Sequence, residues 1–383
     1  MNMIIEEGFH EKVTGWRRHI HQRAELSNKE FETALYITAK LNELGLLVTT
    51  GVGGTGVMAK IEGNQPGPVI GIRADMDGLP IKECNTIEYK SINEGVMHAC
   101  GHDGHTAILL GAAEKLSKSR NFRGTVILIF QPAEEDGAGA RAMLLDPKWN
   151  DFGIEKIYGL HNIPQIKLGY FALIDGPCMA SEDVFSFRIN SNGGHAAYPH
   201  LSSDIISATS TLVFSISGLS RRICPASEPI VVTVTQIHSG NANNIIPSDS
   251  FINGTVRCFS KKTRMDVQSE LENLGQYIGK AFRLKVKLDY ESGYPVTYNH
   301  KNQVEELKRS AIEAGLKEVD NFPQLLGSED FSYFTEVLPS AYLFLGSGDE
   351  FHTNSLHSCQ YDFNDGALTF GVKLWLSLLN NVS

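Results

Sequence analysis

The segment PVIGIRADMDGLP, residues 68–80, decides how this chain folds. Its first half is a continuous apolar run, which predicts a buried strand, and its second half places two aspartates directly after that strand. Further short apolar runs begin at Val57, Thr125, Lys156 and Ala341. Continuous runs of this length are typical of a mainly parallel sheet whose two faces are both covered by helices. The sequence therefore predicts an α/β domain.

A helix is predicted over residues 29–45, ahead of the first strand. Apolar side chains recur there at helical spacing and a glycine, Gly45, ends the pattern. The spaced apolar residues are Phe31, Leu35, Leu41 and Leu44.

Between residues 181 and 292 the pattern changes to strand, helix, two strands, helix and strand. This βαββαβ order is that of the ferredoxin-like arrangement. We therefore expect two domains: a larger α/β domain that carries the catalytic metal site, formed by residues 1–180 and 293–383, and a small α+β domain, residues 181–292, inserted into it.

Composition excludes several classes of function. The chain has 34 Lys and Arg residues against 44 Asp and Glu, a net charge of −10, so we expect neither nucleic acid nor an anionic membrane as a partner. The N-terminus has two glutamates where a signal peptide needs basic residues, and no apolar run is long enough for a membrane span. Six scattered cysteines are typical of a cytoplasmic protein, and for all except Cys100 we expect buried, reduced thiols.

Groups that bind metals or move protons follow the predicted strands. Ligands of open α/β sheets bind beyond the carboxyl ends of the strands, so five segments are expected to deliver these groups to one edge of the sheet. The groups are Asp75 and Asp77, Glu134 and Glu135, His161 and Asn162, His352 and His357, and those of the loop MHACGHDGH, namely His98, Cys100, His102, Asp103 and His105.

Each group has a structural alternative when taken alone. Asp75 and Asp77 are also typical of a turn, and Glu134 with Glu135 of the start of a helix. A single histidine such as His161 is more often a hydrogen-bonded or surface residue than a ligand. The loop that holds Cys100 is harder to explain structurally, and the coincidence of all five segments favours a metal site.

The spacing of these residues supports metal binding. Cys100 and His102 are two residues apart, so in an extended loop their side chains point the same way. Pro132 favours an extended conformation before it, and the adjacent Glu134 and Glu135 are then expected to point apart and to have different tasks. A thiolate, imidazoles and a carboxylate suit zinc, manganese or cobalt better than calcium or magnesium.

The chain resembles the amidohydrolase subfamily of hippurate hydrolase, auxin-conjugate hydrolases and bacterial N-acyl-amino-acid amidohydrolases. More distantly it resembles aminoacylase-1 and related dinuclear metallopeptidases. The resemblance extends from RRHIHQRAEL near residue 17 to the C-terminus. The chain departs from it at two positions where the family usually has proline, which are Ala24 and Cys359 here. The motifs that carry it are RADMDGLP, MHACGHDGHTA, QPAEE, GLHN, GGHAAYPH, NIIP, GTVR and LHSCQYDFND.

This resemblance implies a site for two divalent ions, of manganese, zinc, cobalt or nickel. Cys100 would bridge both ions, and Glu134 would be the general base of an attack by activated water. His357 is preferred to His352 because it alone fits the pattern His-x-x-x-Tyr-Asp-Phe. The implied ligands are Cys100, His102, Glu135, His161 and His357.

The resemblance also implies roles for three residues of the inserted domain. His195, in NGGHAAYPH, would polarise the scissile carbonyl, in this family often from the other subunit of a dimer. Asn244 would help to hold the carbonyl, and Arg257 the substrate carboxylate through its bidentate guanidinium. We expect a homodimer or higher homo-oligomer formed through this domain.

The function implied is hydrolysis of an N-acyl amino acid to a carboxylic acid and a free amino acid. Three alternatives remain open: a dipeptidase or aminopeptidase on the same dinuclear site, an amidase with Cys100 as nucleophile, and a non-catalytic binding protein. For a Cys100 nucleophile, the sequence lacks any sign of an orienting triad. A non-catalytic binding protein would be expected to lose a metal ligand or the general base, and every proposed position is filled.

Overall fold

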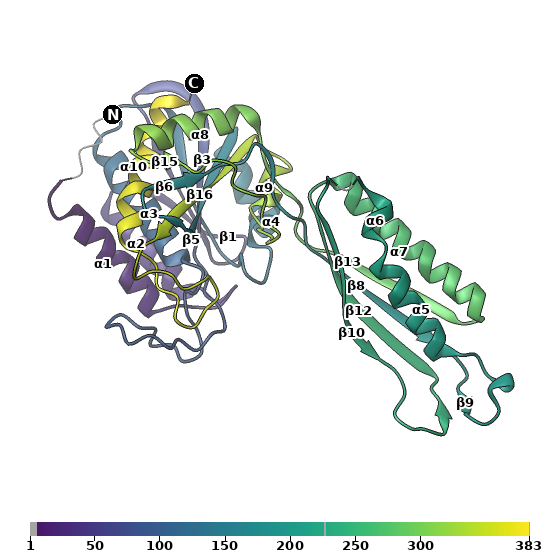
Figure 1. Ribbon diagram of the computed structural model, residues 1–383. Coiled ribbons are helices and arrows are strands. Elements are labelled where there is room, and N and C mark those ends of the chain that lie inside the picture. The colour runs from purple at the N-terminus through teal and green to yellow at the C-terminus, as the bar shows by residue number, and fades with distance from the viewer. Residues whose placement is uncertain (1–5, 226, 383) are drawn as a thin grey trace. The chain divides into compact units, whose positions relative to one another are not determined.

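The computed structural model describes residues 6–225 and 227–382, which divide into two compact units (Figure 1). Unit 1 contains the residues up to Gly176, Tyr298–Pro323 and those from Asp330 onward; unit 2 contains Pro177–Thr297 and Gln324–Glu329. The expected boundaries lie a few residues away, at 180/181 and 292/293. Residues 1–5, part of the stretch considered for a signal peptide, lie outside the described residues.

One segment is grouped differently from the sequence-based expectation. Residues 324–329 were expected in the larger domain, but the structure groups them with unit 2. The reason is hydrogen bonding between backbones: Leu325 N–H donates to Cys178 O, and Ala180 N–H donates to Leu325 O.

Unit 1 is built on an eight-stranded sheet (Figure 1) with the strand order β1-β2-β4-β3-β5-β16-β6-β15. The central strands β4, β3, β5 and β16 are parallel neighbours, whereas β2 pairs antiparallel with β4. All five predicted strands are confirmed, and the sheet is mainly parallel at its centre. The strands are β1 (Leu47–Val52), β2 (Gly56–Glu62), β3 (Gln65–Asp75), β4 (Arg123–Gln131), β5 (Lys156–Lys167), β6 (Tyr170–Ala172), β15 (Lys317–Glu318) and β16 (Ser340–Gly348).

Helices cover both faces of this sheet, which explains why the central strands are apolar throughout. Ile70 and Ile72 of β3 belong to the main core cluster, together with residues of the first group of helices. Arg73 points to the opposite face, where its guanidinium lies 5.9 Å from the ring centroid of Phe331. The first group is α1 (Phe9–Gln22), α2 (Phe31–Glu43), α3 (His102–Lys118), α8 (Lys301–Glu313) and α10 (Gly366–Asn381), and the second is α4 (Gly139–Leu145), α9 (Ser332–Thr335) and the 3-10 helix η1 (Pro147–Phe152).

Helix α2 is confirmed, but only half of its predicted apolar face is correct: Leu41 is buried and Leu44 packs against the core, whereas the other two residues do not. Phe31 and Leu35 are 63% and 70% exposed, whereas Thr33, Ile37 and Leu41 are buried. The buried residues follow one another at intervals of four, so they form the stripe that packs on the sheet. The two large apolar side chains lie outside that stripe.

Unit 2 has the expected ferredoxin-like arrangement. Its antiparallel sheet has the order β10-β12-β8-β13, and Phe185, Phe187, Leu212 and Leu271 pack in one core between sheet and helices. The elements are β8 (Asp183–Asn190), α5 (Ile205–Ser217), α6 (Ser220–Ile223), β10 (Ile230–His238), β12 (Asp249–Cys258), α7 (Lys261–Phe282) and β13 (Lys285–Ser292); short strands β7 (Gly176–Met179) and β14 (Thr297–Asn299) also pair, and a 3-10 helix η2 spans Pro199–Leu201.

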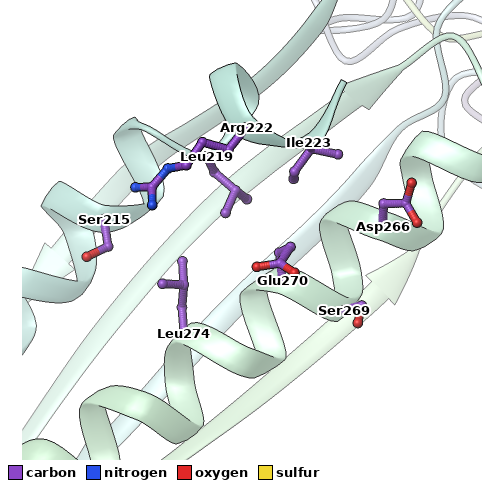
Figure 2. Close-up of a pocket in the computed structure, with 8 residues that line it drawn as sticks. All are labelled: Ser215, Leu219, Arg222, Ile223, Asp266, Ser269, Glu270 and Leu274. Carbon is purple, nitrogen blue, oxygen red and sulfur yellow. The ribbon is translucent and has the colours of Figure 1, made fainter. Parts of the chain in front are cut away.

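A hollow of about 330 Å³ lies on the helical side of unit 2 (Figure 2). Leu219 and Ile223 of the α5–α6 segment face Leu274 of α7, and Arg222, Asp266 and Glu270 contribute charges to its walls (Figure 2). None of the residues that the sequence singles out as catalytic, metal-binding or substrate-binding lines this hollow. It is therefore a separate feature of the surface.

The cysteines are less buried than expected. All six are free, and Cys178 and Cys258 are buried as predicted, but Cys84 is exposed and Cys224 and Cys359 are half-buried. The expectation of burial is thus wrong for three thiols, because each lies in a loop or at a helix end. No helix in the described part of the chain combines the length and apolar character needed to cross a membrane.

Candidate metal centre

Three of the expected ligands meet at one edge of the unit 1 sheet. Cys100 Sγ lies 3.3 Å from His161 Nε2, and the ligand atoms of Cys100, His102 and His161 all lie within 4.8 Å of one another. All three side chains are buried. Contrary to expectation, His161 does not follow the end of its strand but lies inside β5. The pairing of β5 with β3 ends at Gly159, so His161 lies two residues beyond the paired part of these strands.

Gly101 shapes the approach of Cys100 and His102 to each other. It caps the N-terminus of α3 with φ +91°, and His102 is the first residue of that helix, so the extended loop expected here is wrong. A Cβ atom at Gly101 would lie 2.2 Å from Asn162 Oδ1. Only glycine combines this left-handed backbone with so close a neighbour.

The two carboxylates after β4 converge on one imidazole. Glu134 Oε2 and Glu135 Oε1 lie 4.0 and 3.8 Å from His102 Nε2, and the three side chains form one group of possible metal ligands. The expectation that they point apart is therefore wrong. Ala133, directly before them, has φ +52°, and this left-handed residue ends the alternation of an extended chain.

His357 joins the same cluster from the loop after β16. Its Nε2 lies 3.5 Å from Glu135 Oε1, and Cys100, Glu135 and His357 form another group of possible ligands. The backbone N–H of His357 donates to Ala99 O at 2.8 Å, which fixes the loop beside Cys100. His352 has a different neighbour, because its Nδ1 lies 2.8 Å from Asp349 Oδ1.

His102 and His161 both present Nε2 to the cluster. His102 Nδ1 donates to Asp77 O at 2.9 Å, and His161 Nδ1 donates to Asn162 O at 2.8 Å. A backbone carbonyl accepts the Nδ1 proton in each case, so the lone pair of a neutral ring lies on Nε2. Metal-binding histidines are commonly oriented in this way.

The electrostatics of the cluster show an excess of negative charge. Burial alone lowers the pKa of His102, but Asp75 and Asp77 raise it to about 10. Burial raises the pKa of Glu135 to about 7, partly opposed by His102, and burial beside Glu135 and Glu134 raises the pKa of the Cys100 thiol. Protons are thus held on groups that a bound cation would deprotonate.

The residues fit divalent metal ions. His102 Nε2 and Glu135 Oε1 are buried and, among the described residues, have no hydrogen-bond partner, although both face the cluster. Buried polar atoms are rarely left without a partner unless a water or an ion completes the site. The donor set of one thiol, imidazoles and carboxylates matches transition-metal ions.

A hydrogen-bonded chain behind the cluster was not assigned from the sequence. His105 Nδ1 lies 2.6 Å from Asp75 Oδ1, and His105 Nε2 lies 2.7 Å from Asn162 Oδ1. Asn162 Nδ2 in turn donates to Tyr361 Oη at 2.6 Å. All four residues belong to motifs noted in the sequence. They come from four segments distant in sequence, so only the structure reveals this series of hydrogen bonds.

A second buried network connects α1 to the start of α3. His21 Nδ1 lies 2.9 Å from Asp103 Oδ2, and the Arg17 guanidinium contacts Asp103 and Asp365. Burial alone raises the pKa of Asp103, but His21 and Arg17 hold it well below its usual value. Asp103 follows His102 directly, so this network fixes the first turn of α3.

The other three candidate residues lie in unit 2, where His195 has a defined local environment. It belongs to β9 (Gly194–His195), which pairs with β11 (Ile245–Ile246), and its side chain is exposed. Ala197 N–H donates a hydrogen bond to its Nδ1 at 3.1 Å. In a neutral ring this contact places the proton on Nε2.

Asn244 and Arg257 differ in what they offer a substrate. Asn244 is exposed, and its backbone carbonyl accepts a hydrogen bond from Ala196 N–H beside His195. Arg257 contacts Glu182 at 3.1 Å and donates to Thr255 Oγ1 and Val256 O. The guanidinium of Arg257 already has protein partners.

Comparison with known proteins points to one family. The model of the peptidase family M20/M25/M40 matches residues 71–381. N-acetyl-L-cysteine deacetylase of Bacillus subtilis (strain 168) is 39% identical over 88% of this chain and 80% of its own length. Hippurate hydrolase of Campylobacter jejuni subsp. jejuni serotype O:2 is 36% identical over 99% of this chain and 98% of its own.

A solved structure shares the fold over nearly the whole chain. The YXEP protein of Bacillus subtilis, described as a dinuclear metal binding peptidase from the M20 family, is 31% identical to this chain. The superposition of the two structures covers 98% of each chain and has a TM-score of 0.86.

Proposed function

Because the chain belongs to the peptidase family M20/M25/M40, we propose that it hydrolyses the amide bond of an N-acyl amino acid to a carboxylic acid and a free amino acid. The observation that carries this proposal is the largely buried cluster of one thiol, imidazoles and carboxylates at the edge of the sheet. Relatives named for N-acetylcysteine and hippurate suggest an N-acetyl, N-benzoyl or similar acyl group.

We propose Cys100, His102, Glu135, His161 and His357 as the ligands, with Cys100 shared between two ions. When bound, two ions of manganese, zinc, cobalt or nickel would supply Lewis acidity, lowering the pKa of a water molecule and stabilising charge on the carbonyl oxygen. The shared position of Cys100 is supported by its membership of two ligand groups, one with His102 and His161 and one with Glu135 and His357.

We propose Glu134 as the general base. This residue is 7% exposed, and its carboxylate lies at the cluster beside His102, although it is absent from both groups that contain Cys100. It would accept a proton from the attacking water at a carboxylate oxygen and return it to the nitrogen of the leaving amine.

His195 would donate a hydrogen bond from Nε2 to the developing oxyanion. The acceptor role of its Nδ1 toward Ala197 N–H supports this proposal, because it leaves the proton on Nε2. Asn244 would assist at the carbonyl. Arg257 would bind the substrate carboxylate only after exchanging its contact with Glu182.

We also propose that the protein is a cytoplasmic homodimer or higher homo-oligomer assembled through unit 2. Strands β10 and β13 form the two edges of the unit 2 sheet, and unpaired strand edges are natural sites for pairing with another chain. The small-molecule substrate and the net charge of −10 leave no role for nucleic acid.

A hydrolysis panel tests the proposed activity. N-acetyl-, N-benzoyl- and indole-acetyl-amino acids are compared with dipeptides in the presence of Mn²⁺ or Zn²⁺. We expect kcat/KM for the best N-acyl amino acid to exceed that for any dipeptide by at least about tenfold. The opposite ranking would favour the dipeptidase or aminopeptidase.

Chelation separates the metal mechanism from a Cys100 nucleophile. Metal-free protein should lose hydrolysis and regain it with a divalent metal. Burial raises the pKa of Cys100, which disfavours the reactive thiolate. Full activity in verified metal-free protein, abolished by iodoacetamide, would instead support the cysteine mechanism.

A further inference from the structure

Two thiols lie side by side on the surface of unit 1, outside the proposed ligand set. They belong to Cys84, which is exposed, and Cys359, which is half-buried, and a backbone hydrogen bond joins these two residues directly. We propose that Cys84 and Cys359 form a reversible disulfide when the protein meets a low-molecular-weight disulfide. Neither residue has a role in the proposed hydrolysis.

The backbone holds the two cysteines at a suitable separation. Cys84 N–H donates to Cys359 O at 2.7 Å. With standard backbone dimensions, one N–H···O bond of this length keeps the two Cα atoms within roughly 6.5 Å of each other, and disulfide-bonded cysteines have Cα atoms about 4.4–6.8 Å apart. A disulfide therefore requires little movement of the chain.

Two further hydrogen bonds join the segment that follows Cys84 to the segment that follows Cys359. Asn85 Nδ2 donates to Tyr361 O at 2.8 Å, and Tyr89 Oη donates to Asp362 Oδ2 at 2.7 Å. Both segments are thus tied together on one side of the thiol pair. The proximity of the thiols is a consequence of this docking.

The oxidation is balanced by thiol–disulfide exchange. The Cys84 sulfur, the more exposed of the two, attacks one sulfur of the small disulfide, giving a mixed disulfide and one released thiol. The Cys359 sulfur then attacks Cys84, and the second small thiol leaves. The protein loses two electrons to the small disulfide, and the two thiol protons pass to the released thiols.

The cross-link would tether the loop that carries His357. Cys359 lies two residues after His357, and on the other side Glu83, beside Cys84, is buried against His21. A covalent bond between the segments restricts the unfolded chain and the opening of this loop. We therefore expect oxidation to stabilise unit 1.

Peptide mapping of the full chain tests the proposal with oxidised glutathione as the probe. We expect a Cys84–Cys359 linked peptide that disappears on reduction, an unchanged chain mass on a non-reducing gel, and a rise in Tm of about 5 °C. Cys224→Ser should leave all three results unchanged. In Cys84→Ser and Cys359→Ser, the remaining thiol should carry glutathione and the rise in Tm should vanish.

Three results would overturn the inference. The first is glutathione on both cysteines of the wild-type chain without a linked peptide. The second is a doubled mass, which would mean linkage between chains. The third is a linked peptide accompanied by a lower Tm. Because all three results are measured on the wild-type chain, the test does not depend on the variants folding.

Discussion

Glu134 and Glu135 are neighbours in the chain, but their surroundings differ. Glu135 Oε1 lies near both His102 and His357, and its backbone N–H donates to Asp77 Oδ2 at 3.0 Å. Glu134 belongs to the group of possible metal ligands that contains His102 and Glu135, but to neither of the groups that contain Cys100. A residue anchored between two imidazoles is suited to bind metal, whereas its neighbour is suited to move a proton.

Glu134→Gln should keep metal content near the wild-type level and lower kcat by about 10²–10⁴-fold, because it removes the proposed base and no ligand. Glu135→Gln, the matched control, should lower metal occupancy. Elemental analysis and steady-state kinetics of both variants decide between the roles. The reverse pattern would exchange the two assignments.

At the scale of elements, the start of α3 positions the cluster. Gly101 provides the left-handed turn, His102 begins the helix, and Asp103 connects its first turn to α1. Phe363 also packs on this turn, because a Cβ at Gly104 would lie 2.3 Å from its ring. Three segments distant in sequence therefore determine where His102 points.

Gly101→Ala should destabilise unit 1 by about 1–3 kcal/mol, because alanine must adopt a positive φ and its Cβ would collide with Asn162. Denaturant unfolding measures this change. Gly95→Ala is the matched control: its φ is +81°, but no atom lies within 4 Å of the added Cβ, so it should cost less. Equal costs would mean that the contact with Asn162 is unimportant.

The contact between α1 and α3 predicts a pH dependence of stability. Burial alone lowers the pKa of His21, but Asp103 and Glu83 raise it from 6.5 to about 9. The folded protein binds this proton more tightly than the unfolded chain, so the contribution is complete below pH 6.5 and is lost as pH rises through about 9.

His21→Gln should therefore flatten the fall in unfolding free energy between about pH 7 and 9.5. The measurement is denaturant unfolding across this range. His19→Gln on the same helix should leave the slope unchanged, because burial lowers the pKa of His19 and it titrates below this window. An unchanged slope in His21→Gln would contradict the raised pKa.

At the scale of the whole molecule, unit 2 is inserted into the sequence of unit 1. Unit 1 carries all five proposed ligands and Glu134, whereas His195, Asn244 and Arg257 belong to unit 2. The proposed chemistry thus depends on two units that each have their own core.

His195→Ala should lower kcat by about 10²–10³-fold and change KM less, because an oxyanion donor acts on the transition state. If the partner subunit supplies His195, mixing His195→Ala with Glu134→Gln under subunit exchange should restore about a quarter of wild-type activity. Proven exchange without recovery would favour a site within one chain. Unchanged kinetics in His195→Ala would remove the catalytic role.

Local sequence pattern determined much of this protein. The apolar runs predicted the five strands, and the element order predicted the ferredoxin-like insertion, because alternation and length are properties of neighbouring residues. The resemblance singled out five ligand positions, and their ligand atoms gather in the groups at the sheet edge. The metal-binding and catalytic roles of these residues remain predictions.

Only the tertiary structure decided which side chains are buried and where they point. Leu35 is exposed while Thr33 is buried, and Glu134 and Glu135 converge because Ala133 leaves the extended conformation. The contact between Cys84 and Cys359 joins residues far apart in the chain. Burial and contact depend on atoms that distant segments contribute, and the pattern of neighbouring residues contains no information on those atoms.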